Sequence, residues 1–315
     1  MNLVAKRHWF YLLSAIIIVP GIISLLIPPS LYLGIEFTGG STISVEFEAP
    51  VTHAQVREVM NKLGHSEAEI QTAGANSYFI RTTTLREANV QTGASSEQDV
   101  IKQAFGGLAT VSHMEVASVS GVVAKDTVRN AFIAVVIASI AILLYITYAF
   151  RHVPNPVRFG TTAVIALIHD VLVVTGIFSI LGKMPVHMEI NAMFITGLLT
   201  VIGYSVHDTI VVFDRIRENS ARLPGERLER VINISILETL GRSLNTSLTV
   251  VFTTLALLLL GGESIRGFLL VLLIGIVTGT YSSICVASQL LMSWESGEIG
   301  SLLRRFHLLP ARSQA

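Results

Sequence analysis

The chain has 315 residues, of which 51% are hydrophobic and only 14% are charged, and its mean hydropathy is positive. Soluble domains typically carry about a quarter charged residues, so the composition favours a membrane protein over a soluble enzyme or binding module. The 22 basic and 22 acidic residues cancel, so the net charge argues neither for nucleic acid nor for an acidic partner, and no nucleic acid is expected. The single cysteine, Cys285, excludes an internal disulfide.

Six apolar stretches are long enough to cross the hydrocarbon core as helices, which takes about 20 residues each. We expect them at residues 9–27, 127–150, 159–181, 190–213, 243–260 and 267–291. The first follows Lys6 and Arg7, but it is too long for the apolar part of a secretory signal and lacks a small-residue cleavage site. The sequence therefore predicts a multi-pass protein of the lipid bilayer whose first span is an uncleaved anchor.

Basic residues are unevenly distributed among the predicted loops. With a cytoplasmic N-terminus, the inner side carries most of the arginines: Arg151, Arg158, Arg215, Arg217, Arg222, Arg227, Arg230, Arg304 and Arg305. The short outer loops keep only Lys183 and Arg266. The positive-inside rule then predicts that both termini are cytoplasmic. The expected organisation is a cytoplasmic N-terminus with the first span (1–33), an extracytoplasmic domain (34–126), five further spans (127–291) with a cytoplasmic loop at 214–242, and a cytoplasmic tail (292–315).

The predicted extracytoplasmic domain contains alternating strands and helices. Residues 41–48 alternate polar and apolar side chains, as a half-buried strand does, and Thr52 and Gly64 are suited to begin and end a helix. Strands follow at 68–73 and 77–82 as a hairpin, and Ser95 with Gln98 resembles a capping box before a second helix. A last strand is expected at 110–119. The order βαββαβ predicts an α+β ferredoxin-like domain inserted between the first and second transmembrane helices.

This domain pattern specifies no chemistry by itself. Its histidines, His53, His65 and His113, lack the spacing of metal ligands. The sequence predicts no metal site and no cofactor.

Two acidic residues lie inside predicted spans, where an ionisable group is costly and usually functional. Asp170 follows His169 in the third span, and Asp208 follows His207 on the inner half of the fourth. Asp170 has two interpretations, packing against a neighbouring helix or participation in a proton path. The two histidines are expected to orient their neighbours, although an imidazole can also carry a proton near neutral pH.

The fifth span opens with Arg242, and Asn245, Thr246, Thr249 and Thr253 follow at helical spacing along one face. A polar stripe of this kind is expected to face protein or water. Arg242 is long enough to reach Asp208, so the sequence predicts an ion pair that protonation of Asp208 would break. The alternative is a static pair that only fixes helix packing.

Three strings carry a family resemblance. They are Gly34 to Gly40 (GIEFTGG), Gly203 to Asn219 with its GYSVHDT and FDRIREN segments, and Arg242 to Thr246 (RSLNT). Together with six spans and one large first outer loop, they resemble the SecF proteins of the SecD/SecF family, within the resistance-nodulation-division superfamily.

The resemblance implies a subunit of the Sec protein-export machinery of the bacterial inner membrane. It implies a heterodimer with SecD that acts beside the SecY channel complex and SecA, and that uses the proton gradient to promote late translocation of an unfolded exported polypeptide. In that family the residues matching Asp208, Arg242 and Thr246 are associated with proton movement. The chain departs from the family in having Glu36 for Asp, Ser243 for Thr, and no proline within residues 118–123.

Two further segments have open interpretations. Gly34, Gly39 and Gly40 allow a sharp change of backbone direction, which is either a hinge or a simple tight turn. Residues 226–240 place apolar side chains on one side and charges elsewhere, so we expect an amphipathic helix at the inner membrane interface.

Three other functional classes are an exporter, a passive scaffold and an enzyme. A proton-coupled small-molecule or lipid exporter of the same superfamily would need a larger porter region than one domain of about ninety residues. A passive scaffold for the translocon would not need Asp208 and Arg242. An enzyme is not expected, because the chain has neither a phosphate-binding loop with lysine nor a nucleophile elbow.

Overall fold

The computed structural model describes residues 2–74, 76–87, 95–153, 155–184, 188–262 and 265–298. The chain divides into two units, which we call the membrane unit (Met1–Tyr32 with Ile133–Ala315) and the sheet unit (Leu33–Phe132). Arg304 and Arg305, which contributed to the predicted orientation, lie outside the described residues.

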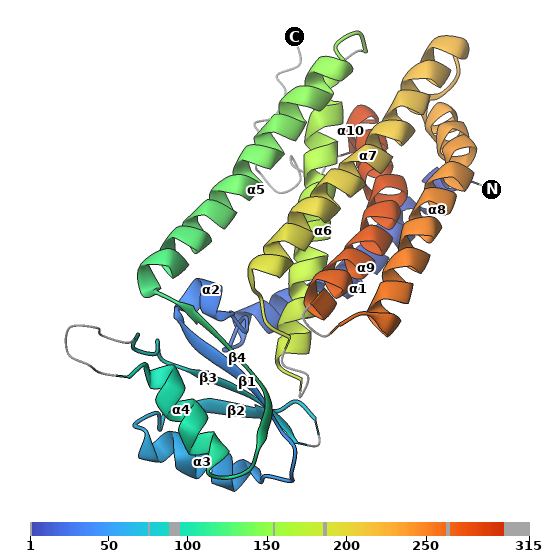
Figure 1. Cartoon of the computed structure of the whole chain (residues 1–315). Coiled ribbons are helices and arrows are strands. Elements are labelled where there is room, and N and C mark those ends of the chain that lie inside the picture. The colour runs from blue at the N-terminus through green and yellow to red at the C-terminus, as the bar shows by residue number, and fades with distance from the viewer. Residues whose placement is uncertain are drawn as a thin grey trace. The chain divides into compact units, whose positions relative to one another are not determined.

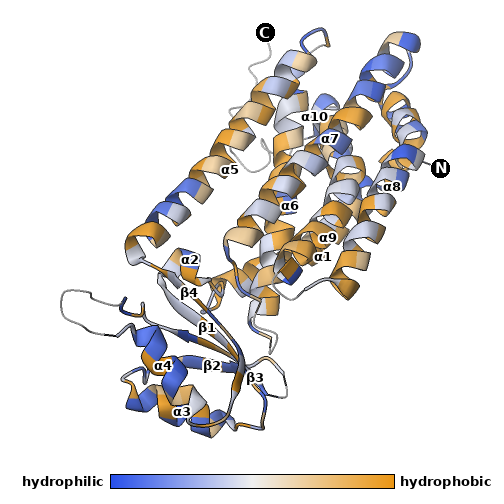
Figure 2. Ribbon diagram, viewed as in Figure 1, coloured by the Kyte–Doolittle hydropathy of each residue, from blue (hydrophilic) through white to orange (hydrophobic). Residues whose placement is uncertain are grey.

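In the described part of the chain, six helices are long and apolar enough to cross a membrane, as predicted. A short 3-10 turn, η1 (Val4–Lys6), precedes the first. The six are α1 (Arg7–Leu26), α5 (Gly121–Ala149), α6 (Pro156–Gly182), α7 (Ala192–Arg222), α8 (Leu228–Leu260), and α9 (Arg266–Ser282), which continues through a π-helical turn, η3 (Ser283–Ala287), into α10 (Ser288–Glu295). Hydrophobic residues run along these helices (Figure 2).

The interior of the membrane unit is formed by α6, α7 and α9 with η3 and α10, which are its most buried spans (Figure 1). Phe150, Phe159 and Phe213 form a buried aromatic cluster there, with Phe159 and Phe213 ring centroids 5.3 Å apart. The backbone of α1 at Gly21 lies directly against the backbone of α6 at Gly176. A Cβ added at Gly21 would be only 2.9 Å from the Gly176 Cα.

The structure changes three expectations in this unit. Residues 214–242 form no long loop, since α7 continues to Arg222 and α8 begins at Leu228. The helix expected at 226–240 exists, but it is the first part of α8, because nothing between Leu228 and Ser243 breaks a helix. The second span begins at Gly121, six residues before the expected start, since no proline precedes it.

The sheet unit contains a four-stranded antiparallel sheet and two helices after a short turn of helix, α2 (Ile35–Thr38). Its elements are β1 (Gly40–Phe47), α3 (His53–Lys62), β2 (Glu69–Thr72), β3 (Ser77–Thr82), α4 (Glu97–Gly106) and β4 (Val111–Val119), with strand order β2-β3-β1-β4. Alternate residues of β1, such as Ile43 and Val45, point into a core that also holds Phe105 from α4. The predicted strands, helices and hairpin are confirmed.

The two helix starts of this unit show how local signals act. Thr52 caps α3 through a capping box with Gln55, as the sequence indicates. The predicted cap of α4 at Ser95 is wrong by one residue. Ser96 is the N-cap, and its hydroxyl accepts a hydrogen bond from the Asp99 backbone amide. The same hydroxyl donates to the Asp99 carboxylate, so the residue that pairs with the cap is Asp99 and not Gln98.

Candidate functional site in the membrane unit

Asp208 is a buried acid on α7, with a side chain that is 6% exposed. Its Oδ1 accepts a hydrogen bond of 2.5 Å from the Ser243 hydroxyl of α8. Its Oδ2 is buried and has no hydrogen-bond partner within the described ranges. A carboxyl with one satisfied oxygen and no paired cation is costly to hold as an anion in this environment.

The predicted ion pair between Arg242 and Asp208 is wrong. Arg242 is exposed and makes no ion pair with Asp208 in the part of the chain that the structure describes. Neighbouring residues of a helix point about 100° apart, so α8 can present only one of Arg242 and Ser243 to α7. It presents Ser243, whose side chain is 1% exposed.

Arg242 instead lines a cavity of about 460 Å³ between the ends of α7 and α8. The other lining residues are Ile210, Val211, Asp214, Arg215, Glu218, Glu238 and Thr239. Within it, Arg215 pairs with Glu238 at 2.6 Å and with Glu218 at 2.5 Å. The Asn219 amide also donates to Glu238 at 2.7 Å. The sequence analysis missed this cluster, although Arg215 and Glu218 stand three residues apart on one helical face.

The polar stripe of α8 is exposed on the surface of this chain. Thr246 donates to the backbone oxygens of Arg242 (2.8 Å) and Ser243 (3.0 Å). Thr249 and Thr253 bond to backbone carbonyls in the same way, and Asn245 is exposed beside them. Thr246 therefore does not contact Asp208 by a hydrogen bond, and it shares an outward face with Arg242.

Asp170 is more buried than Asp208 and better satisfied. Its carboxylate accepts from the His169 ring at Oδ1 (3.0 Å) and from Ser205 (2.5 Å) and Ser282 (2.8 Å) at Oδ2. The other ring nitrogen of His169 lies 3.0 Å from the Ser14 hydroxyl of α1. Asp170 thus joins α1, α6, α7 and α9 in one polar network.

The aspartates of the two His-Asp pairs have similar surroundings, but the histidines do not. Each aspartate accepts a hydrogen bond of 2.5 Å from a serine on the next long helix, 35 residues further along the chain. The histidines differ, because His169 is buried against its aspartate while His207 is exposed. No hydrogen bond joins His207 to Asp208 in the described segments.

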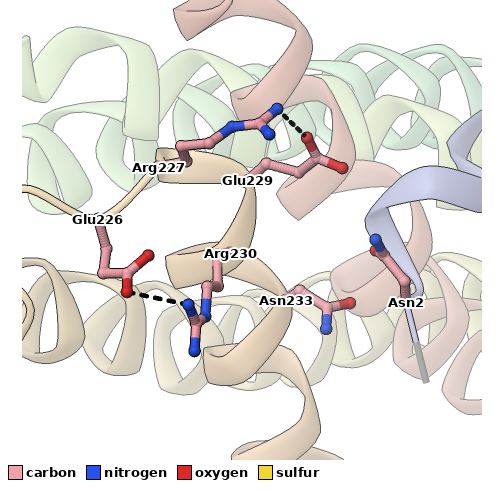
Figure 3. A pocket seen from close by; sticks show the side chains of 6 residues that line it. All are labelled: Asn2, Glu226, Arg227, Glu229, Arg230 and Asn233. Carbon is pink, nitrogen blue, oxygen red and sulfur yellow. Dashed lines mark hydrogen bonds and ion pairs between the residues drawn. The ribbon is translucent and has the colours of Figure 1, made fainter.

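A second polar cavity, of about 490 Å³, lies where the chain passes from α7 to α8. Asn2, Glu226, Arg227, Glu229, Arg230 and Asn233 line it (Figure 3). Arg230 pairs with Glu226 and Arg227 with Glu229, and Asn233 accepts from the Leu3 amide at 2.7 Å. The hydrogen bond between Leu3 and Asn233 links the N-terminal turn to the start of α8.

The three candidate hinge glycines have different conformations. Gly39 and Gly40 have φ of 73° and 120°, which L-residues with side chains rarely adopt, whereas Gly34 has an ordinary φ of −67°. A Cβ at Gly40 would lie 2.6 Å from the Thr82 carbonyl oxygen. One conformation of this segment is consistent with both a hinge and a tight turn.

Among the described residues, no three His, Cys, Asp or Glu side chains gather as a metal site would require. The polar groups that come together are instead carboxyls, hydroxyls and one imidazole. Side chains of these kinds can donate and accept protons.

Comparison with known proteins gives a consistent assignment. A family model described as protein export membrane protein SecD/SecF, C-terminal, matches residues 100–297, and one for the SecD/SecF GG motif matches residues 31–51. The chain is 47% identical to the protein translocase subunit SecF of Thermobaculum terrenum, covering 97% of both chains. It is 41% identical to that of Anaerolinea thermophila, again with 97% of each chain covered.

Fused relatives and solved structures extend the comparison. The chain is 34% identical to the protein translocase subunit SecDF of Bacillus subtilis, covering 94% of this chain and 38% of that protein. The crystal structure of SecDF from Thermus thermophilus matches with a TM-score of 0.78 and 31% identity over 94% of this chain and 39% of that one. A super-membrane-facing form of SecDF matches with a TM-score of 0.63, 30% identity, and coverage of 97% and 40%. The chain spans about two fifths of the SecDF proteins.

Proposed function

The chain belongs to the SecF branch of the SecD/SecF protein-export family, and from this premise we propose that its Asp208 couples proton binding to export. It is a multi-pass membrane protein of the bacterial inner membrane and a subunit of the protein-export machinery. Its relatives are named as translocase subunits, which is a transport role.

The surroundings of the Asp208 carboxyl carry the proposal. A buried acid with one hydroxyl donor, and with one oxygen that has no hydrogen-bond partner among the described residues, gains and loses a proton with little rearrangement of its neighbours. The family resemblance adds Arg242 and Thr246 to the proton-coupling set, with Asp170 and His207 as further members. In this chain Arg242 and Thr246 act from the outward face of α8, not through a direct bond to Asp208.

A route for protons to Asp208 is supported by the cavity between the ends of α7 and α8. Ile210 and Val211, two and three residues beyond Asp208, line this cavity, and the charged residues Arg215, Glu218 and Glu238 line it as well. Water in a cavity with this charged lining would connect the helix ends to the neighbourhood of the acid.

The exposed polar stripe of α8 is the surface that we propose for contact with SecD. Arg242, Asn245 and Thr246 would be expensive to leave against lipid, so a protein surface must cover them. In the SecDF relatives the two subunits form one chain, which places an association with SecD within the family. The family further suggests the SecY channel complex, SecA and the unfolded exported polypeptide as partners.

The finer organisation also belongs to this proposal. The arginine distribution supports cytoplasmic termini and an extracytoplasmic sheet unit at about residues 34–126. The βαββαβ element order and the strand order β2-β3-β1-β4 support a ferredoxin-like class for that unit. The positive φ of Gly39 and Gly40, between the first span and the first strand, supports a hinge at Gly34, Gly39 and Gly40.

The decisive experiment replaces Asp208 by Asn, which keeps the shape and removes the titratable group. The Asp208→Asn variant should assemble with SecD normally. Inner-membrane vesicles that contain it should lose the component of export that depends on the proton gradient. Normal gradient-dependent export by this variant would overturn the proposal and favour a passive scaffold. Substrate-dependent ion flux by the purified chain alone would favour a small-molecule or lipid exporter.

A further inference from the structure

His169 is not among the residues of the proposed proton-coupling set, but it is bonded directly to one of them, Asp170. Its side chain is 8% exposed, and both ring nitrogens have a hydrogen-bond partner. We propose that His169 is a second proton-binding group of the membrane unit, with Asp170 as its fixed counter-charge and Ser14 with Tyr281 as partners that adjust to its charge. This inference rests on the proposed proton coupling and adds a group to it.

The hydrogen bonds around Asp170 suit it to the role of a fixed counter-charge. Its two oxygens accept three hydrogen bonds, from His169, Ser205 and Ser282. A carboxylate only accepts, so the ring nitrogen that faces it, Nδ1, carries a proton. Three donors stabilise the charged form of a carboxyl, in contrast to the single donor at Asp208.

The other side of the ring can satisfy both charge states. The His169 Nε2 atom is 3.0 Å from the Ser14 hydroxyl, which is 3.2 Å from the Tyr281 hydroxyl. Tyr281 in turn donates to the Phe10 carbonyl at 2.7 Å. When the ring is neutral, Ser14 donates to Nε2. When a proton binds at Nε2, that nitrogen donates to Ser14, whose hydroxyl turns and donates to the Tyr281 oxygen.

This exchange leaves no group in the network without a partner in either state. Among the described residues, the titratable side chains that interact with His169 are Asp170 on its own helix and Tyr281 on α9, whose ring centroid is 6.1 Å away. Cys285 follows Tyr281 by four residues, on η3. The pair His169–Asp170 therefore alternates between a net charge of −1 and 0, and a buried pair tolerates both values better than it would tolerate +1.

The first helix responds directly to this proton, because Ser14 belongs to α1. In the neutral state the hydroxyl of Ser14 points to α6, and in the protonated state it points to α9. Since α1 runs into the segment that precedes the sheet unit, the charge of His169 is communicated to the helix that connects the two units in sequence.

The test is a titration of the full-length chain in lipid bilayers by ¹⁵N NMR of labelled histidine rings. The His169→Gln variant identifies the resonance of His169 by its loss. We expect that resonance to be an Nδ1–H tautomer at high pH and to become doubly protonated as the pH falls. A resonance that stays in one neutral form throughout the pH range in which the chain is folded would overturn the inference.

Tyr281→Phe sharpens the test, because it removes an acceptor that only the protonated state uses. It should move the midpoint of the His169 titration about one unit to lower pH, a tenfold loss in proton affinity. Ser139→Ala is the matched control, since the Ser139 hydroxyl of α5 bonds only to its own helix, at the Val135 carbonyl. Equal midpoints in the Tyr281→Phe and wild-type chains would contradict the adjustable-partner role. The titration does not depend on export, so failure of Asp208→Asn to affect export is a separate result.

Discussion

Ser243 donates a hydrogen bond of 2.5 Å to Asp208, and no guanidinium in the described part of the chain reaches either oxygen of that carboxyl. The hydrogen-bond partner of Asp208 among the described residues is therefore a neutral side chain and not an ion-pair partner. Removing the neighbour and removing the nearest arginine should have different effects, which makes the two roles separable.

Ser243→Ala removes the only hydrogen bond that the Asp208 carboxyl receives from the described residues. Because a hydrogen bond to a charged group contributes about 1.5–3 kcal/mol, Asp208 should hold its proton roughly tenfold more tightly. Infrared titration of the Asp208 carboxyl band in the purified chain measures this change. Ser243→Thr keeps the hydroxyl and should leave the midpoint in place, so a shift of equal size in both variants would contradict the assignment.

Arg242→Gln should leave the Asp208 titration unchanged in the purified chain, since Arg242 is exposed and makes no ion pair with Asp208 within the described residues. The same variant should weaken association with SecD, because the polar stripe loses its charged member. Copurification from membranes measures the association, with Arg222→Gln as the control, an exposed arginine at the end of α7. A change in Asp208 titration as large as that of Ser243→Ala would restore the ion-pair hypothesis.

The site shows where a sequence stops being informative. The position of Asp208 inside an apolar span follows from span length, and the polar face of residues 242–253 follows from helical periodicity. The pairing was wrong because a rotation of about 100° decides whether Arg242 or Ser243 faces α7. That rotation is set by packing of whole helices, which no local pattern contains.

Gly40→Ala should destabilise the sheet unit. Its φ of 120° is unfavourable for alanine, and the added Cβ would lie 2.6 Å from the Thr82 carbonyl oxygen. Strained backbone of this kind costs about 1–3 kcal/mol, and the steric clash adds to that cost. Hydrogen exchange at the amides of β1 and β3 in the intact protein measures the loss. Gly34→Ala, at an ordinary φ of −67°, is the control and should change these exchange rates little.

Gly176→Ala should weaken the packing of α1 on α6, because its Cβ would lie 2.8 Å from the Gly21 Cα. Overpacking of this kind costs about 1–3 kcal/mol. Gly203→Ala makes the same substitution within a helix, but its Cβ would have nothing within 4 Å. It should be neutral or stabilising by up to about 1 kcal/mol, since alanine favours helix. Thermal unfolding in detergent compares the two, and equal effects would contradict a backbone contact.

Most of the fold was predictable because its signals are local. Apolar runs of sufficient length indicated all six spans, and the alternation at 41–48 with the caps at Thr52 and Gly64 indicated β1 and α3. The turn of π-helix at Ser283–Ala287 was not predictable, since an apolar run looks the same with or without it. Nor was the role of Ser14, because its partner His169 is 155 residues away.

The contact between Gly21 and Gly176 has a mechanical consequence. Where side chains separate two helices, a change of rotamer under tension allows one helix to slide along the other. Backbones in direct contact, as at Gly21 and Gly176, do not allow such sliding. Beyond this contact, Ser24 and Ser179 bond across the same seam at 2.8 Å, and Lys183 bonds to the Ile27 carbonyl where α1 ends. A pull exerted through residues 27–34 would therefore displace α1 and α6 together, as one stiff strut.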